Sequence, residues 1–206
     1  MFLELLRVKQ YYKNLLVFLV LIFTGEALNL SSTGLVVLGF VSLCLMSSTN
    51  YILNDIFDIE KDKKHPEKKG RPLAAGKINV FWAVVVAMVC AVVSLAIAGY
   101  LSYLFFLLVV ALFLFTQVYS LYLKNLIFLD VIAIAVNFVL RAVSGNYILD
   151  TVISPWLVVC AFFLSLFLVV AKRRGDLVLL GKNAEKHKEV LKYYSVDLLD
   201  KLSLII

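Results

Sequence analysis

The chain has 206 residues, of which 63% are hydrophobic and only 17% are charged, and its mean hydropathy is +0.96. These values exclude an ordinary soluble domain of this length. We therefore predict an all-α polytopic membrane protein with one transmembrane domain over residues 1–206. The formal net charge is +6, but the basic residues flank apolar runs and alternate with carboxylates. This arrangement indicates membrane topology and small-anion contacts and argues against a nucleic-acid partner.

Six apolar runs have lengths close to the roughly 20 residues that cross a bilayer. We predict spans over residues 14–28, 34–58, 80–101, 103–122, 126–143 and 154–171, and the start of a seventh near Tyr194. The first run lacks a small-residue cleavage site, so we predict a retained helix. Because a partial span would leave backbone groups exposed in lipid, we expect the chain to be C-terminally truncated.

Lysines and arginines gather on one side of these predicted spans. They occur in residues 1–13, in the 59–79 connection, at Lys124 and in the 172–192 connection, whereas the intervening connections contain none. The positive-inside rule then places the N-terminus and the basic connections in the cytoplasm. We expect a multi-pass protein of a bacterial-type inner (plasma) membrane.

The N-terminal residues 3–13 are amphipathic enough to lie along the cytoplasmic interface. Tyr11 and Tyr12 are aromatic residues of the kind found at that depth. The alternative is that the polar residues of this segment reach into a site formed by later helices. We favour the interfacial anchor for the segment and keep Lys13 as a candidate substrate-binding residue.

Carboxylates accumulate where the second predicted span meets water. On a helix Asn54, Asp58 and Asp62 are four residues apart and Asp55 lies three before Asp58, so they share one face. Carboxylates this close resist joint ionisation unless a cation lies between them, and Mg²⁺ accepts a few carboxylates while bridging to phosphate. A solvated helix end is the alternative. We predict that Asp55, Asp58 and Asp62 are catalytic metal ligands and that Asn54 completes the site.

The connection after this cluster is basic and contains two prolines. Pro66 and Pro72 block helical continuation, so we expect the segment to fold back over the helix end. Lys68 and Arg71 are then placed to bind phosphate oxygens that a metal does not cover.

Further polar residues lie at the same predicted face. Tyr119 and Lys124 close the fourth span, and Asp130 is either a functional acid in the fifth span or a partner for Lys124. Lys172, Arg173 and Asp176 follow the sixth span. Together with Tyr119 and Lys124 they are candidate substrate-binding residues. A basic cluster at a helix end is usually a topology signal, but here it can also complete an anion site.

The stretch Asn54-Asp55-Ile56-Phe57-Asp58-Ile59-Glu60-Lys61-Asp62 resembles the NDxxDxxxD motif of the UbiA superfamily of intramembrane prenyltransferases at every fixed position. Within that superfamily the chain is most similar to the decaprenyl-phosphate phosphoribosyltransferase branch. The segments that carry this likeness are Arg7-x-Lys9-Gln10-x-x-Lys13-Asn14, His65-Pro66-x-Lys68-x-x-Arg71-Pro72, Tyr119-Ser120-x-x-Leu123-Lys124, Phe138-Val139-Leu140-Arg141-Ala142 and Lys172-Arg173.

Two features depart from the superfamily pattern. Aromatic prenyltransferases carry a second aspartate-rich motif after the sixth helix, whereas residues 172–192 contain only Asp176. This favours the phosphoribosyl branch, although that branch has Glu where this chain has Asp176. The resemblance also implies a UbiA-like bundle of about nine spans, of which the last ones are not in this sequence.

The resemblance implies transfer of a 5-phosphoribosyl group from 5-phosphoribosyl-1-diphosphate to a polyprenyl phosphate, with Mg²⁺ as cofactor and diphosphate as product. It further implies a role in making an arabinose-containing cell-wall polymer and allows a homo-oligomer in the bilayer. A UbiA-type aromatic prenyltransferase with a polyprenyl diphosphate donor is the alternative. A transporter or non-catalytic membrane protein is a second alternative, disfavoured because the polar residues gather at one face and not at the midplane.

Overall fold

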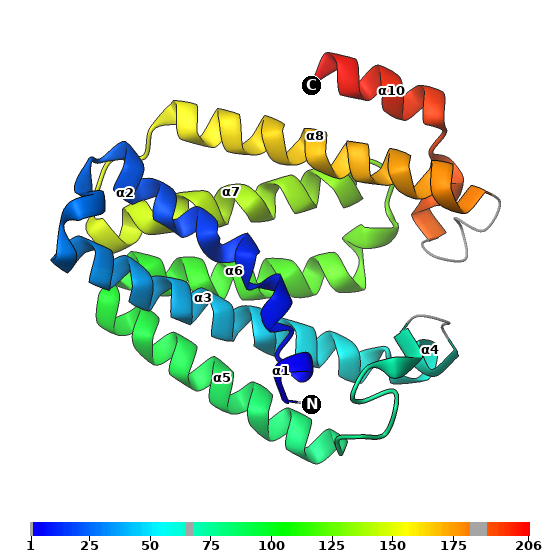
Figure 1. The fold of residues 1–206 in the computed structure, drawn as a ribbon, viewed down its shortest axis with the longest axis horizontal. Helices are drawn as coiled ribbons and strands as arrows, with labels where there is room; N and C mark the ends of the chain where they lie inside the picture. Colours follow the sequence, from blue (N-terminus) through cyan, green and yellow to red (C-terminus); the bar gives the residue numbers. More distant parts are fainter. Residues whose placement is uncertain (1, 65–67, 182–188) are drawn as a thin grey trace. The chain divides into compact units, whose positions relative to one another are not determined.

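The computed structural model describes residues 2–64, 68–181 and 189–206. These residues form helices and connecting turns (Figure 1), with no strand in the described ranges. The contacts divide the chain into two compact units. The first comprises Met1–Leu114 and Ser144–Val152, and the second comprises Phe115–Val143 and Ile153–Ile206. The helices α6 and α7 therefore contribute to both units.

The first unit contains the N-terminal helices, a long helix pair and the acidic stretch. Its elements are α1 (Phe2–Leu5), η1 (Val8–Phe18), α2 (Leu19–Phe23), η2 (Glu26–Leu28), α3 (Leu30–Phe57), α4 (Ile59–Lys64), η3 (Lys68–Gly70), α5 (Val80–Leu101) and most of α6 (Tyr103–Leu121). The second unit contains the end of α6, η4 (Leu123–Asn125), most of α7 (Leu129–Leu149), α8 (Pro155–Leu180), η6 (Glu189–Tyr193) and α10 (Val196–Ile205).

Five of the described helices are long and apolar enough to cross a membrane: α3, α5, α6, α7 and α8. They correspond to five of the six predicted spans. The largest difference in their bounds is at α8, which continues to Leu180 and ends at Gly181, where φ is +49°. The basic cluster predicted to lie in a loop after residue 171 is therefore helical, because no proline interrupts the chain there.

The first predicted span, residues 14–28, is not a single α-helix. A 3-10 helix runs from Val8 to Phe18, α2 adds five residues, and the chain turns at Gly25, where φ is +74°. A 3-10 helix rises about 2.0 Å per residue and an α-helix about 1.5 Å, so η1 is longer than an α-helix of the same number of residues would be. Val17 of η1 is fully buried, and its backbone lies close to Gly145 of α7.

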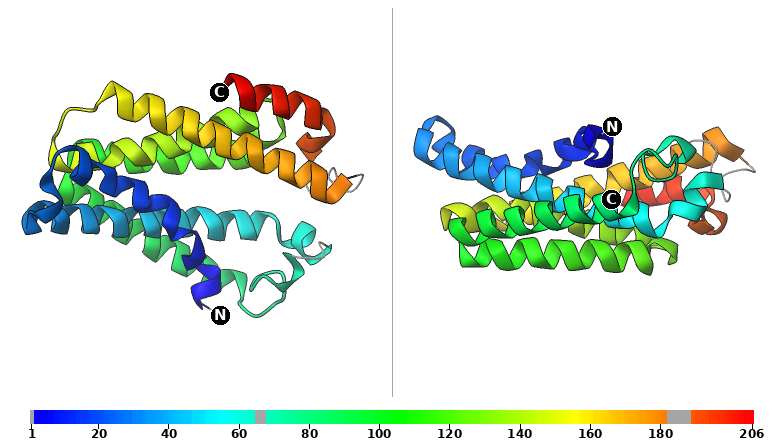
Figure 2. Two further views of the ribbon diagram at one scale, coloured as in Figure 1. Left: turned by 45° about the horizontal axis from the view of Figure 1, so that its top comes forward. Right: turned by 90° about the horizontal axis from the view of Figure 1, so that it is seen from below.

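The helices α3 and α5 lie side by side in the first unit (Figure 2), and small polar residues join them. The Ser42 hydroxyl donates to the Ser94 carbonyl at 2.8 Å, and the Ser94 hydroxyl donates to the Ser42 carbonyl at 2.8 Å. Nearer the acidic end, the Thr49 hydroxyl donates to the Ala87 carbonyl at 3.2 Å. Close backbone approach through small residues is typical of helix pairs in membranes, and it fixes the end of α3 from which the acidic residues project.

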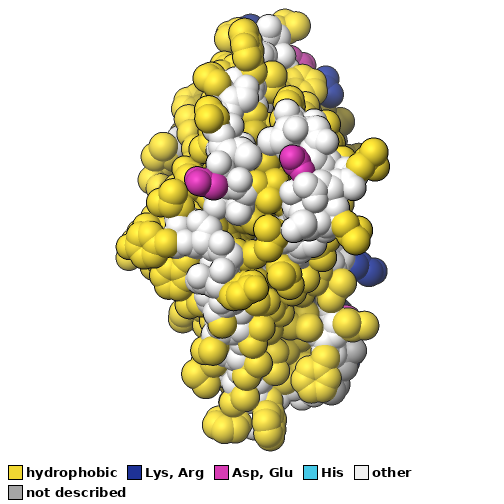
Figure 3. Space-filling model, turned by 90° about the vertical axis from the view of Figure 1, so that its left-hand side faces the viewer, with side chains coloured by type: hydrophobic (Ala, Val, Ile, Leu, Met, Phe, Trp, Pro, Cys, Tyr) yellow, Lys and Arg dark blue, Asp and Glu magenta, His cyan; other side chains and the backbone are white. Residues whose placement is uncertain are grey.

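Hydrophobic side chains cover most of the face drawn in Figure 3. Many large apolar residues are exposed across the five long helices, including Trp82, Leu107 and Trp156. The shorter α10 is less apolar than these helices, because three of its ten residues are charged: Asp197, Asp200 and Lys201. Leu199 of α10 is fully buried and packs in one cluster with Val170 of α8.

Candidate functional site

Two buried carboxylates lie at the acidic end of α3. The side chains of Asp55 and Asp62 are 3% and 5% exposed, and both accept hydrogen bonds from the same nitrogen of Arg71. Arg71 Nη1 is 3.0 Å from Asp55 Oδ1 and 2.5 Å from Asp62 Oδ2. One guanidinium nitrogen therefore occupies the position between two carboxylates.

The backbone explains why these two acids meet. The helical bonding pattern passes through the junction of α3 and α4, where Asp58 N donates to Asn54 O at 3.0 Å and Asp62 N donates to Asp58 O at 2.8 Å. Asp55 and Asp62 are thus about two helical turns apart on one side. Asp58 itself is at the junction, with its side chain 32% exposed and 3.9 Å from Lys61. The structure gathers Asp55 and Asp62, and it does not place Asp58 on the shared guanidinium.

A second guanidinium reaches the same carboxylate from the N-terminal segment. Arg7 Nη2 donates to Asp55 Oδ1, and its guanidinium carbon lies 5.0 Å from the ring centroid of Tyr51. The favoured interpretation of this segment as an interfacial anchor leaves Arg7 out of the predicted site residues. The alternative, in which polar residues of the segment reach into a site formed by later helices, agrees with this contact.

The N-terminal segment packs on α3, which agrees with the alternative that its polar residues reach a site formed by later helices. Leu5 is fully buried in a cluster with Ile52 and Leu73, and Ser48 Oγ donates to the Leu6 carbonyl at 2.8 Å. Lys13 of η1 is half-buried, with Nζ 5.9 Å from the centroid of Tyr12. This contact does not connect Lys13 to the acidic pair.

The basic connection folds back onto the helix end, as its prolines predicted. The Pro72 carbonyl accepts from Lys77 N at 2.9 Å and from Ile78 N at 3.3 Å, closing a compact loop. Lys68 lies in η3, half-buried, three residues before Arg71. Pro66 lies outside the described residues.

Asp55 and Asp62 suit a divalent cation that takes only one or two ligands from the protein. In the described part of the chain no three His, Cys, Asp or Glu side chains form a metal-binding group, so the predicted Asp55, Asp58 and Asp62 trio is not assembled. Mg²⁺ commonly takes only one or two carboxylates and completes its shell with water and substrate phosphates. Asp55 and Asp62, which already share one cationic nitrogen, match that requirement.

A second buried acid organises the other unit. Asp130 at the start of α7 is fully buried and accepts from Arg173 Nε at 3.1 Å and from the Tyr194 hydroxyl at 2.7 Å. The Tyr194 oxygen also accepts from Phe128 N at 2.9 Å. Burial, and then the hydrogen bond to Asp130, raise the pKa of Tyr194 above its ordinary value of 10.0.

Arg173 is not the open phosphate contact that the sequence predicted. It is 7% exposed, its Nε is bound to Asp130, and its Nη1 lies 3.7 Å from Asp176. Tyr119 also hydrogen-bonds to Arg173. Asp176 and Tyr119, both half-buried, are thus partners of Arg173 in one network.

The neighbouring cations differ from Arg173 in exposure. Lys172 is exposed on α8, Lys124 is half-buried in η4, and Arg174 binds Asp200 on α10. Lys172 and Arg174 are both exposed, and Arg174 already binds a carboxylate.

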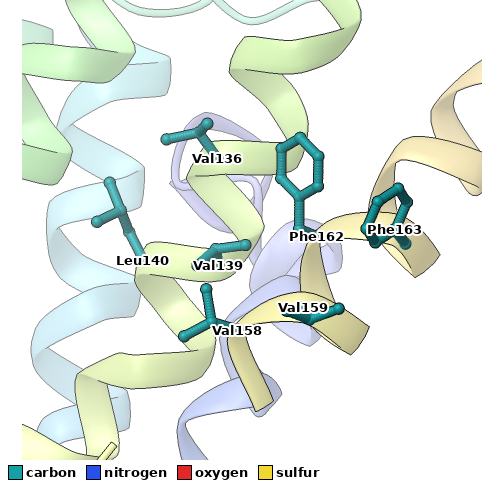
Figure 4. A pocket seen from close by; sticks show the side chains of 7 residues that line it. All are labelled: Val136, Val139, Leu140, Val158, Val159, Phe162 and Phe163. Carbon is teal, nitrogen blue, oxygen red and sulfur yellow. The ribbon is translucent and has the colours of Figure 1, made fainter. Parts of the chain in front are cut away.

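A cavity of about 320 Å³ lies between α7 and α8 and is lined only by apolar side chains. Figure 4 shows its lining, Val136, Val139, Leu140, Val158, Val159, Phe162 and Phe163. With no polar group in its wall, it is unsuited to a phosphorylated sugar.

Comparisons with known proteins agree with the motif. The sequence model of the UbiA prenyltransferase family matches residues 15–177. The decaprenyl-phosphate phosphoribosyltransferase of Mycolicibacterium smegmatis is 32% identical over 194 residues, which cover 92% of this chain and 61% of that protein. The protein of the same name from Corynebacterium glutamicum is 31% identical over 198 residues, covering 92% of this chain and 58% of that protein. This chain therefore spans about three fifths of the length of these relatives.

A solved structure has the same fold. The UbiA homologue from Archaeoglobus fulgidus bound to DMAPP and Mg²⁺ superposes with a TM-score of 0.76 at 25% sequence identity, covering 98% of this chain and 75% of that chain. That protein binds a prenyl diphosphate together with the metal.

Proposed function

Because the chain belongs to the UbiA prenyltransferase family, an integral multi-pass membrane family, we propose that it transfers a 5-phosphoribosyl group from 5-phosphoribosyl-1-diphosphate to a polyprenyl phosphate. Diphosphate is released. The observation that carries this proposal is the pair of buried carboxylates, Asp55 and Asp62, gathered with two arginines at the end of a membrane helix. Relatives named decaprenyl-phosphate phosphoribosyltransferase support the choice of substrates.

The proposed cofactor is Mg²⁺, held by Asp55 and Asp62, with Asp58 and Asn54 beside them in the motif. When bound, the ion supplies positive charge that stabilises the diphosphate leaving group as the anomeric carbon–oxygen bond breaks. The face concerned is the one that the distribution of lysines and arginines predicts to be cytoplasmic.

The protein's own residues bind and orient the donor in this proposal. Arg71 and Lys68 neutralise phosphate charge that remains on the donor. An oxygen of the lipid phosphate attacks the anomeric carbon, forming the new bond while the diphosphate leaves with the electron pair of the old one. The lipid phosphate is already ionised, so no strong general base is required, and positioning of the two reactants contributes much of the rate. Lys13, Lys124 and Lys172 stay predicted substrate contacts, whereas Tyr119, Arg173 and Asp176 belong to the network around Asp130.

A second candidate is transfer of a prenyl group from its diphosphate to an aromatic acceptor. The favouring observation is the Archaeoglobus fulgidus homologue, which is bound to DMAPP and Mg²⁺. The segment of residues 172–176 argues against this candidate, because it is basic and contains Asp176 as its only acid, in place of a second aspartate-rich motif.

One assay separates these two reactions. Purified protein in lipid nanodiscs is incubated with Mg²⁺, radiolabelled 5-phosphoribosyl-1-diphosphate and polyprenyl phosphate, and the lipid fraction is counted. The proposal expects a labelled lipid that depends on Mg²⁺. Label that stays in the aqueous phase, together with product from a prenyl diphosphate and an aromatic acid, would overturn it.

A further inference from the structure

The cavity between α7 and α8 has an apolar wall throughout (Figure 4). Its volume is about 320 Å³, and four of its seven lining side chains are valines. A dry apolar cavity of about 150 Å³ is already large enough to bind a small hydrocarbon molecule. Water is not a suitable occupant, because a buried water needs polar partners and this wall offers none. The cavity therefore suits a hydrocarbon.

The cavity opens onto a surface that faces the bilayer. Val159 and Phe163, which line it, are 44% and 45% exposed. On the same helix Leu164 and Leu168 are also exposed, and α8 is apolar enough to cross a membrane. The cavity is thus continuous with the lipid-facing surface of α8. The hydrocarbon chains of the bilayer are the molecules that reach it directly.

The depth of the cavity matches the acyl-chain region of one leaflet. Its α8 residues begin at Val158 and end at Phe163, about 5 to 12 Å along the helix from Pro155. Half of the hydrocarbon core is about 15 Å thick. Trp156, at the same end of α8, is 75% exposed, as is usual for a tryptophan at the membrane–water interface. The basic residues 172–174 lie toward the other end. The cavity therefore belongs to the leaflet at the Trp156 end.

The walls are stiff enough to hold one chain in a defined place. Valine side chains have few rotamers because they are branched at Cβ. The rings of Phe162 and Phe163 contact each other edge to face, with centroids 5.6 Å apart and an interplanar angle of 83°. Lipid chains are as apolar as these side chains, so the gain on filling comes from van der Waals contacts that an unfilled wall lacks. A chain inside the cavity makes such contacts on several sides at once.

We propose that the cavity between α7 and α8 binds one acyl chain of a phospholipid from the leaflet at the Trp156 end. The bound chain fills the space between the two helices and stabilises their contact. The site contains none of the residues of the acidic pair. The inference goes beyond the proposed function and does not depend on it.

Photo-crosslinking tests the inference. The protein is placed in nanodiscs doped with a phosphatidylcholine that carries a diazirine within one acyl chain, and adducts are located by mass spectrometry after irradiation. The wild type should be labelled more strongly on the cavity wall than on the exposed face of α5. Val139→Phe places a ring in the cavity and should lose most of this labelling. Val92→Phe, the same change at a position of α5 that is 67% exposed, is the control and should keep it.

Three outcomes of this experiment would overturn the inference. Equal labelling of the wall in the wild type and in Val139→Phe would show only ordinary contact with the surrounding lipid. Labelling that polyprenyl phosphate displaces and unlabelled phosphatidylcholine does not would assign the cavity to an isoprenoid chain. A wall without lipid adducts would show that another polypeptide segment covers the cavity.

Thermal unfolding in detergent gives a second measurement. Phosphatidylcholine with long acyl chains should raise the melting temperature of the wild type, because it binds the folded state. Short acyl chains should raise it less, since fewer methylene groups enter the cavity. Val159→Phe, which narrows the mouth of the cavity, serves as a second variant should Val139→Phe not fold. Its rise should be smaller than that of Val92→Phe, and equal rises in all these proteins would contradict the inference.

Discussion

Two buried aspartate–arginine groups use the same chemistry in different surroundings. In the first unit the side chains of Arg7 and Arg71 are 25% and 28% exposed while they bind Asp55. In the second unit the Arg173 side chain is 9% exposed and Asp130 is fully buried. The Tyr194 hydroxyl donates a hydrogen bond to the carboxylate oxygen of Asp130 that Arg173 does not bind. The first group is accessible from water and the second is enclosed.

This difference separates an exchangeable site from a structural one. A guanidinium that is partly hydrated can leave its carboxylate for a phosphate at modest cost, because water solvates both groups during the exchange. An enclosed pair leaves an uncompensated charge in a region of low dielectric when either partner is lost. We therefore expect substitutions in the first group to change ligand binding and turnover, and substitutions in the second to change stability.

The largest expected effect is at the enclosed group. Asp130→Ala leaves Arg173 buried without this partner and should lower the free energy of unfolding by about 3–5 kcal/mol. Unfolding by sodium dodecyl sulfate titration in mild detergent measures it. Asp200→Ala, which removes the exposed partner of Arg174, is the control and should leave the midpoint unchanged. Equal midpoints for Asp130→Ala and the wild type would show that the second group is not a structural lock.

The exchangeable group should respond in activity. Asp62→Asn removes a charge from the proposed metal site and should lower phosphoribosyl transfer by about 10²–10³-fold, the loss typical of removing one electrostatic contact to a developing charge. Its unfolding midpoint should stay much closer to the wild type than that of Asp130→Ala. Asp197→Asn on α10 provides a control of the same chemistry at an exposed position. Transfer at the wild-type rate by Asp62→Asn would remove that residue from the mechanism.

The two units also differ in how tightly a glycine is packed in each. A Cβ at Gly145, in the first unit, would lie 2.4 Å from the Val17 carbonyl oxygen and 2.5 Å from Val20 Cγ1, so Gly145→Ala should destabilise by about 1–3 kcal/mol. At Gly175 of α8 a Cβ meets nothing within 4 Å. Gly175→Ala should therefore stabilise by about 0.5–1 kcal/mol through helix propensity. Opposite shifts in thermal midpoint are expected, and a shared sign would refute the contrast.

The last prediction concerns Tyr194, which binds the second oxygen of Asp130. Tyr194→Phe removes a hydrogen bond to a buried carboxylate and should cost about 1–2 kcal/mol near neutral pH. Because the folded-state pKa of Tyr194 is raised above 10.0, its contribution is fully present below pH 10 and is lost as pH rises further. The difference in melting temperature between wild type and variant should thus be constant from about pH 7 to 9 and shrink above pH 10. A difference that grows with pH would contradict the direction of the shift.

The sequence predicted well those features that depend on local pattern. Apolar run length located five long helices, and the predicted span over residues 80–101 coincides with α5. Pro72 predicted that Arg71 turns back toward the acidic helix end. The failures involved neighbours far apart in the chain. The spacing of residues does not indicate that Arg7 binds Asp55, 48 positions later, although the alternative interpretation of the N-terminal segment allows it. It also does not indicate that Asp130 binds Arg173 and Tyr194.

The sequence by itself determined the membrane helices and the acidic motif at the end of α3, because hydrophobic length and four-residue spacing act within one segment. The tertiary structure decided which cation each aspartate binds and how far water reaches each pair, since both depend on side-chain packing between elements. Asp55 and Asp130 are both buried, and the two groups differ in the exposure of their arginines, which is 25% and 28% beside Asp55 and 9% beside Asp130. That exposure is a property of the folded chain.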